Sequence, residues 1–238
     1  MKPPVIFENE DFIAVNKPAG LLTIPDRYNY EQPSLSKMLE AIAGKIFIVH
    51  RLDRDTSGVI LFAKNESSHK YFSQLFEKRV VEKTYLGIVK GSFTEKEGII
   101  NEPIAEHPHH KGVMIIDKKG KASVTEYKVI EDYGIYSLIR FRIQTGRTHQ
   151  IRIHAKFAGH PIICDATYGD GKSILLSSFK KKYKLSKDSE QEHPLINRTA
   201  LHSFQLKLPG MQGEIHLIEA PVPKDMKALL QQLKKNRS

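Results

Sequence analysis

The sequence predicts an α+β protein with a mixed, largely antiparallel sheet flanked by helices and loops. Short runs rich in β-branched and aromatic residues recur along the 238 residues, and such runs are typical of strands. Most of them follow one another directly along the chain, as antiparallel pairing allows. Segments with helical periodicity come at irregular intervals, whereas a parallel α/β fold needs one after nearly every strand.

The N-terminal third is predicted to contain a hairpin, a helix and two buried strands. Residues 5–7 and 12–15 are apolar runs separated by four polar residues, which indicates a strand pair. A helix is predicted over 34–43, with a serine as its cap. The runs 46–49 and 59–63 have the length and the β-branched content of buried strands.

The middle of the chain is predicted to contain a helix and three strands. Ser67 is a candidate N-cap for a helix that extends to about Arg79 and carries an apolar stripe rich in aromatic residues. A strand over 84–89 follows by composition. Two longer strand-like segments, 122–130 and 135–143, are predicted to pair as a hairpin.

The C-terminal part combines a helix, a loop, a strand pair and a final helix. A helix is predicted over 148–158, because a glycine and a proline follow it. A lysine-rich segment at about 172–190 has little apolar periodicity and is predicted to be a mobile loop. Strands over 200–208 and 214–219 precede an amphipathic helix at about 224–236.

The organisation of the chain favours a single catalytic domain over 1–238, with its core at about 5–220. No apolar run approaches the roughly 20 residues that span a membrane, and no signal-peptide pattern is visible at the start. The one cysteine, Cys164, cannot form an internal disulfide. These features predict a cytoplasmic protein with no membrane segment.

The charge balance favours a polyanionic partner. Lysine and arginine number 37 against 27 acidic residues, which gives a formal net charge of +10 at pH 7. Such an excess suits nucleic acid or an acidic membrane surface. The basic residues are dispersed in loops and do not line one amphipathic helix, so nucleic acid is the favoured partner. No obligate protein partner is indicated, and a monomer is expected.

A polar loop, His50–Gly58, lies between two predicted strands and contains several charged or ionisable side chains. Loops held by a rigid scaffold are frequent places for chemistry. Composition alone leaves a second interpretation open, in which Asp53, Asp55 and the hydroxyl residues form only a hydrogen-bonded turn before the glycine.

A second polar cluster, Gln144–His154, lies where a predicted strand ends and a predicted helix begins. On that helix His149 and Arg152 are three residues apart and are expected to share a face. Arg147 is near the first turn, where backbone N–H groups can bind an anion. An arginine here can pair with a buried carboxylate or hold a phosphate. Taken alone, the cluster is equally compatible with a solvated basic helix face.

Three histidines, His107, His109 and His110, lie close together in the sequence and raise the question of a metal site. Their spacing matches no zinc signature, and the proline and lysine around them favour a solvated loop. We therefore expect no metal and no organic cofactor.

The chain resembles the large family of RNA pseudouridine synthases. The family's hallmark is His-Arg-Leu-Asp-x-x-Thr-Ser-Gly, and residues 50–58 match it at every fixed position. Four further segments resemble the family's opening motif, its tyrosine-bearing strand, its arginine motif and its late active-site strand. In the family's order, they are 16–21, 83–85, 145–154 and 200–203.

The resemblance implies roles for individual residues. It makes Asp53 the catalytic aspartate and Tyr85 the aromatic residue beside the uracil. It makes Arg152 the ion-pair partner of the aspartate, and Leu201 the apolar contact beneath the base. Asp55 falls at a variable position of the hallmark and receives no catalytic role.

Three basic residues, Lys17, Arg51 and Arg147, are predicted to contact phosphates of the splayed RNA backbone. Cys164 is a departure from the pattern, because relatives usually have glycine there, and it raises the question of how tight that turn is. Only about 15 residues precede the opening motif. The chain therefore resembles the compact members, which lack an additional N-terminal RNA-binding domain.

The expected function is isomerisation of uridine to pseudouridine in ribosomal or transfer RNA. An alternative is an RNA-binding or ribosome-assembly protein whose catalytic pocket is vestigial. A metal-dependent RNA hydrolase that uses Asp53, Asp55 and the histidines is a third possibility.

Overall fold

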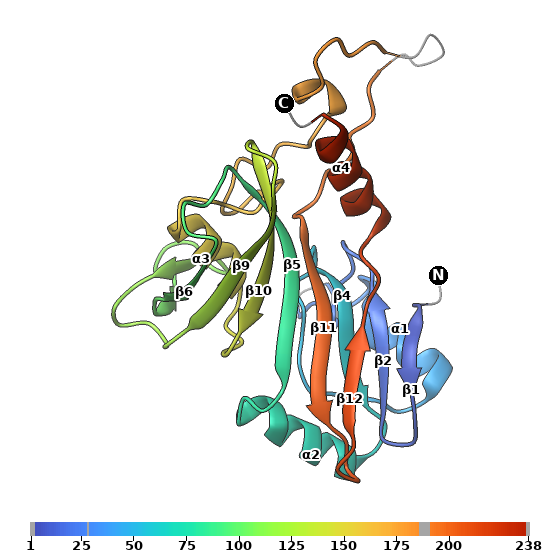
Figure 1. Ribbon diagram of the computed structural model, residues 1–238. Helices are drawn as coiled ribbons and strands as arrows, with labels where there is room; N and C mark the ends of the chain where they lie inside the picture. The colour runs from blue at the N-terminus through green and yellow to red at the C-terminus, as the bar shows by residue number, and fades with distance from the viewer. Residues whose placement is uncertain (1–2, 28, 186–190, 237–238) are drawn as a thin grey trace. The chain divides into compact units, whose positions relative to one another are not determined.

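The computed structural model describes residues 3–27, 29–185 and 191–236. The chain folds into two compact units, and each is built from three separate segments (Figure 1). Unit 1 comprises Met1–Tyr85, Arg142–Thr148 and Leu201–Pro221. Unit 2 comprises Leu86–Phe141, His149–Ala200 and Val222–Ser238. That the whole chain acts as one catalytic domain stays a prediction.

Unit 1 contains a mixed sheet in which antiparallel pairs predominate. Its central order is β1-β2-β4-β11, with β3 paired to β4 and β12 paired to β11. The β4–β11 pair is parallel, and the other pairs are antiparallel. The strands are β1 (Val5–Glu8), β2 (Phe12–Lys17), β3 (Phe47–Ile48), β4 (Ser57–Ala63), β11 (Leu201–Pro209) and β12 (Ile215–Glu219). This sheet confirms the predicted fold class and both of the hairpins predicted for these segments.

The two strands that flank the polar loop differ more than the sequence predicts. β4 is buried along its whole length. β3 has only two residues and leaves Ile48 exposed, so the expectation of a buried strand over 46–49 is wrong. The loop is therefore carried mainly by β4, which lies inside the sheet.

Two helices belong to unit 1, α1 (Leu35–Ala43) and α2 (Glu66–Glu77). The N-cap of α2 is Asn65, whose side chain accepts a hydrogen bond from the Ser68 amide at 2.8 Å. The Ser68 hydroxyl in turn accepts from the Asn65 amide at 3.3 Å, which completes a capping box. The predicted cap, Ser67, is thus wrong by two residues.

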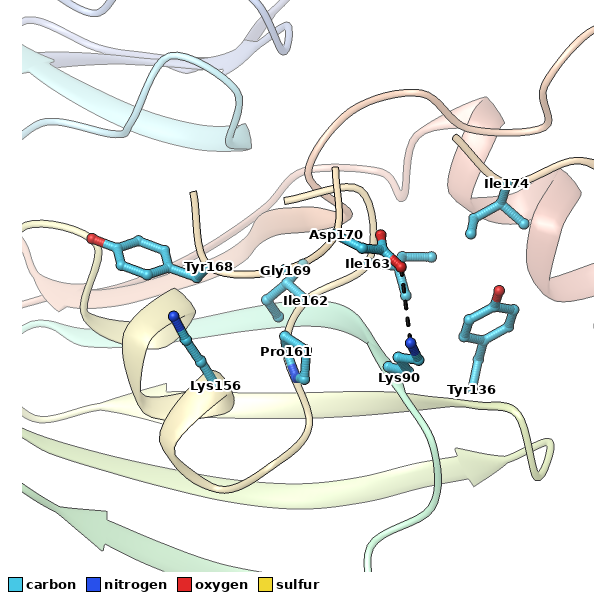
Figure 2. A pocket seen from close by; sticks show the side chains of 10 residues that line it. All are labelled: Lys90, Tyr136, Lys156, Pro161, Ile162, Ile163, Tyr168, Gly169, Asp170 and Ile174. Atoms are coloured by element: carbon cyan, nitrogen blue, oxygen red, sulfur yellow. Dashed lines mark ion pairs between the residues drawn. The ribbon is translucent and has the colours of Figure 1, made fainter. Parts of the chain in front are cut away.

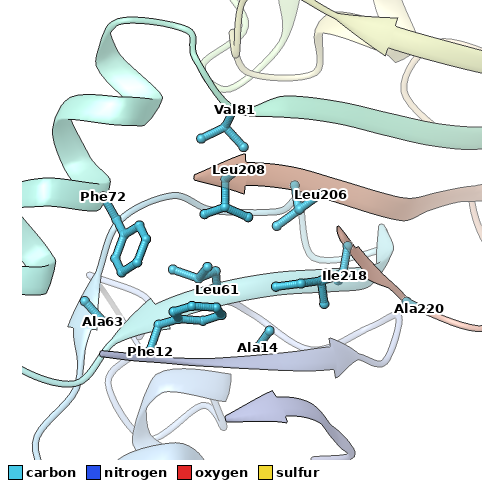
Figure 3. Packing of buried hydrophobic residues seen from close by; sticks show 11 residues of the cluster. Phe12, Ala14, Leu61, Ala63, Phe72, Val81, Leu206, Leu208, Ile218 and Ala220 are labelled. Carbon is cyan, nitrogen blue, oxygen red and sulfur yellow. The ribbon is translucent and has the colours of Figure 1, made fainter. Parts of the chain in front are cut away.

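The core of unit 1 joins α2 to the sheet. Figure 3 shows Phe72 of α2 above Phe12 and Leu61, with Leu206 and Leu208 of β11 beside them. The Phe12 and Phe72 rings meet edge to face at 5.2 Å. Each of these fully buried side chains contributes about 1.5–3 kcal/mol by burial. This packing fixes β4, which begins four residues after Asp53.

Unit 2 contains a second run of strands, a small sheet and two helices. Strands β5, β10, β9 and β6 follow one another in that order, and β5 and β10 also extend into unit 1. Their bounds are β5 (Glu82–Lys90), β6 (Glu97–Asn101), β9 (Val124–Asp132) and β10 (Tyr136–Ile143). Strands β7 (Ile104–Glu106) and β8 (Met114–Ile116) pair separately, and the helices are α3 (Gln150–Phe157) and α4 (Lys224–Lys235).

Helix α3 begins later than predicted. His149 takes the left-handed conformation, with φ 54°, and so cannot belong to the first turn. The expectation that His149 and Arg152 share a helix face is therefore wrong. The His149 ring instead forms a hydrogen bond to the Tyr168 hydroxyl at 2.9 Å.

The lysine-rich segment contains a short 3₁₀ helix, Leu176–Ser178. An isolated bridge joins Ile174 to Ile196. The predicted loop extends over 186–190, which lie outside the described residues, and its mobility stays a prediction. In the described ranges, no helix has both the length and the apolar character to cross a membrane.

Candidate active site

The polar loop of unit 1 is tied to the opening segment by main-chain hydrogen bonds. The Thr23 hydroxyl donates to the Leu52 carbonyl at 2.8 Å and accepts from the Leu52 amide at 3.2 Å. The Gly20 amide donates to the Arg54 carbonyl at 2.9 Å. These bonds hold the residues on both sides of Asp53. The loop is therefore part of a built scaffold, and a merely solvated turn does not account for it.

Lys17 completes this scaffold. Its side chain is fully buried, and its ammonium donates to the carbonyls of Pro18, Leu21 and Arg54 at 3.0, 2.7 and 2.8 Å. The three N–H donors of a lysine are thus satisfied by backbone oxygens. The predicted phosphate contact of Lys17 is wrong, because the ammonium is committed inside the protein.

His50, the first residue of the hallmark, has a structural role. Its Nε2 accepts a hydrogen bond from the Leu61 amide at 3.0 Å, and its ring stacks on Phe76 at 4.3 Å. Burial, with a smaller contribution from the charge of Lys83, lowers the pKa of His50 to about 3. The imidazole is therefore neutral at physiological pH.

The end of the hallmark joins β4 to β11. The Ser57 hydroxyl and the His202 ring form a hydrogen bond at 2.9 Å, and the Ser203 hydroxyl donates to the Val59 carbonyl at 3.0 Å. Gly58 has φ 114°, and a Cβ there would collide with the Ser203 backbone. Only glycine fits at this position, since the two strands approach closely.

The two aspartates of the loop differ in their surroundings. Asp53 is half-buried, and its carbonyl accepts the Thr56 amide at 3.2 Å. Asp55 forms an ion pair with its neighbour Arg54 at 3.2 Å, and both of these side chains are largely open to solvent. This difference agrees with the catalytic expectation for Asp53 and with the absence of one for Asp55.

Tyr85 belongs to the same unit as Asp53 and is buried. Burial raises the pKa of its phenol, a hydrogen bond with the Ser203 side chain opposes the rise, and the charge of Asp53 adds to it. Tyr85 is therefore a protonated phenol at neutral pH. The influence of Asp53 on its pKa indicates that the two side chains are electrostatic neighbours.

A cavity of about 390 Å³ in unit 1 brings together Tyr85, Arg51 and Arg147, three of the predicted site residues. The other lining residues are Val49, His50, Phe76, Glu77, Arg79, Lys83, Ile143, Thr145 and Gly146. Asp53 is not among the lining residues. Leu201, the first residue of β11, is buried in the same unit and also lies outside this lining.

Arg152 lies in unit 2, where it forms a buried ion pair that the sequence reasoning missed. Its Nε and Nη2 donate to the two carboxylate oxygens of Asp165 at 2.6 and 2.8 Å. The Thr167 and Tyr168 amides also donate to Asp165, at 2.9 and 3.0 Å. Burial alone would raise the pKa of Asp165, but Arg152 and these amides outweigh it, so the pKa is lowered. A fully buried aspartate beside a turn was the signal that could have identified this pair.

Cys164, next to Asp165, explains a departure from the family's pattern. Its φ is 59°, in the left-handed region that favours glycine. The turn therefore keeps the conformation of a glycine turn, although it carries a cysteine. Burial is the main reason that the pKa of this thiol rises to about 11.

Unit 2 has a cavity of its own, of about 370 Å³ (Figure 2). Lys90 and Asp170 face each other across it at 3.9 Å, and Tyr136 and Tyr168 contribute to its walls. None of the predicted site residues lines it. It contains no feature that connects it with the Asp53 loop.

The three histidines of the 106–112 loop fold into a local turn. The Nδ1 atom of His107 accepts hydrogen bonds from the amides of His109 and His110, both at 3.1 Å. Across the described residues, no group of three or more histidine, cysteine or acidic side chains is arranged to hold a metal ion.

The fold and the Asp53 loop agree with the comparisons with known proteins. Residues 11–157 match the family model of RNA pseudouridylate synthases. The chain is 34% identical over 238 residues to ribosomal large subunit pseudouridine synthase D of Nitrosomonas europaea, covering 97% of this chain and 65% of that protein. It is 34% identical over 234 residues to an RNA pseudouridine synthase of Bacillus subtilis, YhcT, with 94% and 70% covered. The chain belongs to the RNA pseudouridylate synthase family.

Solved structures agree on the fold. Human RNA pseudouridylate synthase domain containing 4 superposes with a TM-score of 0.73 at 22% identity, over 97% of this chain and 93% of that one. Human RNA pseudouridylate synthase domain containing 1 gives 0.70 at 25% identity, over 98% and 94%. Both support the α+β architecture described above.

Proposed function

We propose that this chain isomerises uridine to pseudouridine in RNA, with Asp53 as the catalytic carboxylate. The observation that carries the proposal is the position of Asp53, which is half-buried in a loop held on both sides by Lys17, Gly20 and Thr23. A catalytic group must be held in place by its surroundings, and this loop meets that requirement. Membership of the family supports the same reaction.

The reaction breaks the bond between N1 of uracil and C1′ of ribose and forms a bond between C5 and C1′. The proton on C5 leaves, and N1 gains one, so atoms balance without an oxidant or reductant. An ionised carboxylate can begin this sequence by attacking a carbon of the nucleoside or by removing a ribose proton beside the anomeric carbon. Asp53 is proposed for this role.

Tyr85 is proposed to contact the uracil. Its buried phenol remains protonated because its pKa is raised, so it offers a flat face and a neutral hydroxyl rather than a phenolate. The hydrogen bond to Ser203 orients that hydroxyl. The target base must leave its stack to reach such a site, at a cost of a few kcal/mol. Leu201 is proposed as the apolar contact beneath the base.

Two arginines are candidates for keeping Asp53 ionised. The resemblance favours Arg152, whose Nε and Nη2 are already bound to Asp165. Arg147 shares a unit with Asp53 and lines a cavity with Tyr85. Changing each to lysine keeps the charge and removes the planar fork. The variant that loses at least about tenfold in turnover while remaining folded identifies the partner.

The proposed substrate is large-subunit ribosomal RNA, because several similar proteins carry that name, and the net charge of +10 suits RNA. Transfer RNA is the alternative substrate. The enzyme is proposed to act as a cytoplasmic monomer without a metal or an organic cofactor.

Release of tritium from RNA that carries [5-³H]uridine tests the function, because the C5 hydrogen must leave when C5 becomes the glycosidic carbon. Transcripts of large-subunit ribosomal RNA and of transfer RNA, offered separately, identify the substrate. Release at the same rate with and without EDTA is expected. Binding without release would favour the vestigial RNA-binding protein, and strand cleavage that EDTA abolishes would favour the metal-dependent hydrolase.

A further inference from the structure

The cavity that contains Tyr85 is strongly cationic. Four of its lining residues are basic, namely Arg51, Arg79, Lys83 and Arg147, and one is acidic, Glu77. Arg79 and Lys83 come from the turn between α2 and β5 and were not among the predicted site residues. In the described parts of the chain, Glu77 forms no ion pair with any of the four bases.

Lys83 is buried without a partner for its charge. Only 6% of the residue is exposed, and its ammonium has no hydrogen-bond acceptor and no ion pair among the described residues. No fully buried side-chain nitrogen or oxygen of the described chain lacks a partner, so the Lys83 ammonium must reach open space. The cavity that Lys83 lines supplies that space.

This arrangement is electrostatically unfavourable when the cavity holds only water. Burial lowers the pKa of Lys83, and the charge of Arg79 lowers it further. Lys17 shows how the same fold treats a buried lysine that has only a structural role, since it gives that ammonium three carbonyl acceptors. Lys83 has none, and an anion would supply what is missing.

The backbone at Arg79 is a second and independent observation. Arg79 has φ 61° and follows the C-cap of α2, with its amide bonded to the Phe76 carbonyl at 3.2 Å and the Val80 amide bonded to the Leu75 carbonyl at 2.9 Å. This is a helix-ending motif in which glycine is the favoured residue. An arginine here has a conformational cost, which a requirement for its guanidinium at the cavity would explain.

We propose that Arg79 and Lys83, together with Arg51 and Arg147, form a subsite for a phosphate group of the RNA backbone. Tyr85 lies in the wall of the same cavity, so the phosphate belongs to a nucleotide close to the target uridine. The subsite holds the backbone while the base is out of the stack. The inference rests on the proposed function for the identity of the substrate.

Two substitutions test the subsite, and a third is the matched control. Arg79→Gly removes the guanidinium and relieves the left-handed strain, and Lys83→Met removes the buried ammonium while keeping the aliphatic chain. Lys78→Ala also removes one positive charge next to Arg79, from an exposed side chain that does not line the cavity. The measurements are RNA affinity at several salt concentrations and the thermal midpoint of unfolding.

Arg79→Gly is expected to keep or raise the unfolding midpoint and to bind RNA roughly tenfold more weakly, as loss of a charged contact implies. Its dependence of affinity on salt should flatten by roughly 0.7 in the logarithmic slope for each lost phosphate contact on single-stranded RNA. Lys83→Met should behave in the same way. Lys78→Ala should match the wild type in affinity and slope. Wild-type affinity in Arg79→Gly, which is expected to fold, would overturn the proposal.

Inorganic phosphate distinguishes the source of the anion. If the subsite takes an RNA phosphate, inorganic phosphate should weaken RNA binding by the wild type more than chloride of equal ionic strength, and Arg79→Gly should abolish this difference. Phosphate binding without any loss of RNA affinity in the variants would indicate a free-anion site and overturn the RNA assignment. Tritium release by the wild type is measured in parallel, because its absence would refute the proposed function and leave the binding comparison intact.

Discussion

Asp53 in unit 1 and Asp165 in unit 2 show two ways of using a carboxylate. The Asp165 carboxylate is itself the anchor, since it accepts hydrogen bonds from Arg152 and from the Thr167 and Tyr168 amides. Around Asp53 the anchoring is done by main-chain atoms of its neighbours, Leu52 and Arg54. A side chain that holds the fold differs in this way from one whose loop is held in place for it.

The largest expected effect is on the Asp53 side of this comparison. Asp53→Asn keeps the size of the side chain and removes its charge and nucleophilicity. Turnover in the tritium-release assay should fall by several orders of magnitude, as is usual for an essential nucleophile, while the unfolding midpoint stays near that of the wild type. Asp55→Asn is the matched control and should retain most activity, because Asp55 is in an exposed ion pair with Arg54. Near wild-type release by Asp53→Asn would refute the mechanism.

Asp165→Asn should produce the opposite pattern. Removing one partner of a buried ion pair leaves the other charge uncompensated and costs about 3–5 kcal/mol. The free energy of unfolding, measured by urea denaturation, should therefore fall by that order. The low pKa of Asp165 implies that its contribution is present at neutral pH and disappears in acid, below the ordinary aspartate range. A stable Asp165→Asn protein that has lost only its activity would reverse the roles assigned to the two aspartates.

His50 makes unit 1 sensitive to mild acid. Its pKa is about 3 in the folded protein against an ordinary value of 6.5, so below pH 6.5 the unfolded chain binds a proton that the folded one does not. Stability should fall as the pH drops from about 6.5 toward about 3, by up to about 1.4 kcal/mol per pH unit.

His50→Gln keeps a hydrogen-bond acceptor for the Leu61 amide and cannot titrate. Urea denaturation of this variant should show a flatter dependence on pH over the same range. His193→Gln, at an exposed position, is the control and should follow the wild type. Identical pH curves for His50→Gln and the wild type would show that His50 does not remain neutral in the folded protein.

The sequence predicted the features that depend on local pattern. The fold class, the hairpins, α1, the position of the hallmark loop and the grouping of Tyr85 with Arg51 and Arg147 all follow from short segments with clear composition or motifs. The cap of α2 was displaced because Asn65 and Ser67 are both good capping residues, and only the backbone conformation decides between them.

Features that depend on distant contacts were not predictable in the same way. Lys17 was expected to bind phosphate, but its ammonium meets the Arg54 carbonyl, 37 residues away in the sequence. The partnership of Arg152 with Asp165, and the burial of Lys83 without a partner, likewise depend on how strands pair and turns close. A lysine or an arginine in a sequence gives no sign of which carbonyl, carboxylate or cavity it will face.

The smallest expected effect concerns the exposed lysines of unit 2. Lys180, Lys181 and Lys182 are solvent-exposed and belong to the lysine-rich segment, so they can act on RNA through charge without ordering any part of the fold. Replacing all three with alanine should weaken RNA binding by roughly three- to tenfold near physiological salt, or about 0.6–1.4 kcal/mol, and should flatten the salt dependence. The exposed residues Lys118, Lys119 and Lys121, replaced together, remove the same charge from a different loop. Equal flattening by both triple variants would show that net charge alone is responsible, and an unchanged slope in the first would remove the lysine-rich segment from the binding surface. A smaller loss than that of Arg79→Gly would then separate a cation held at a cavity from cations that only attract the polymer.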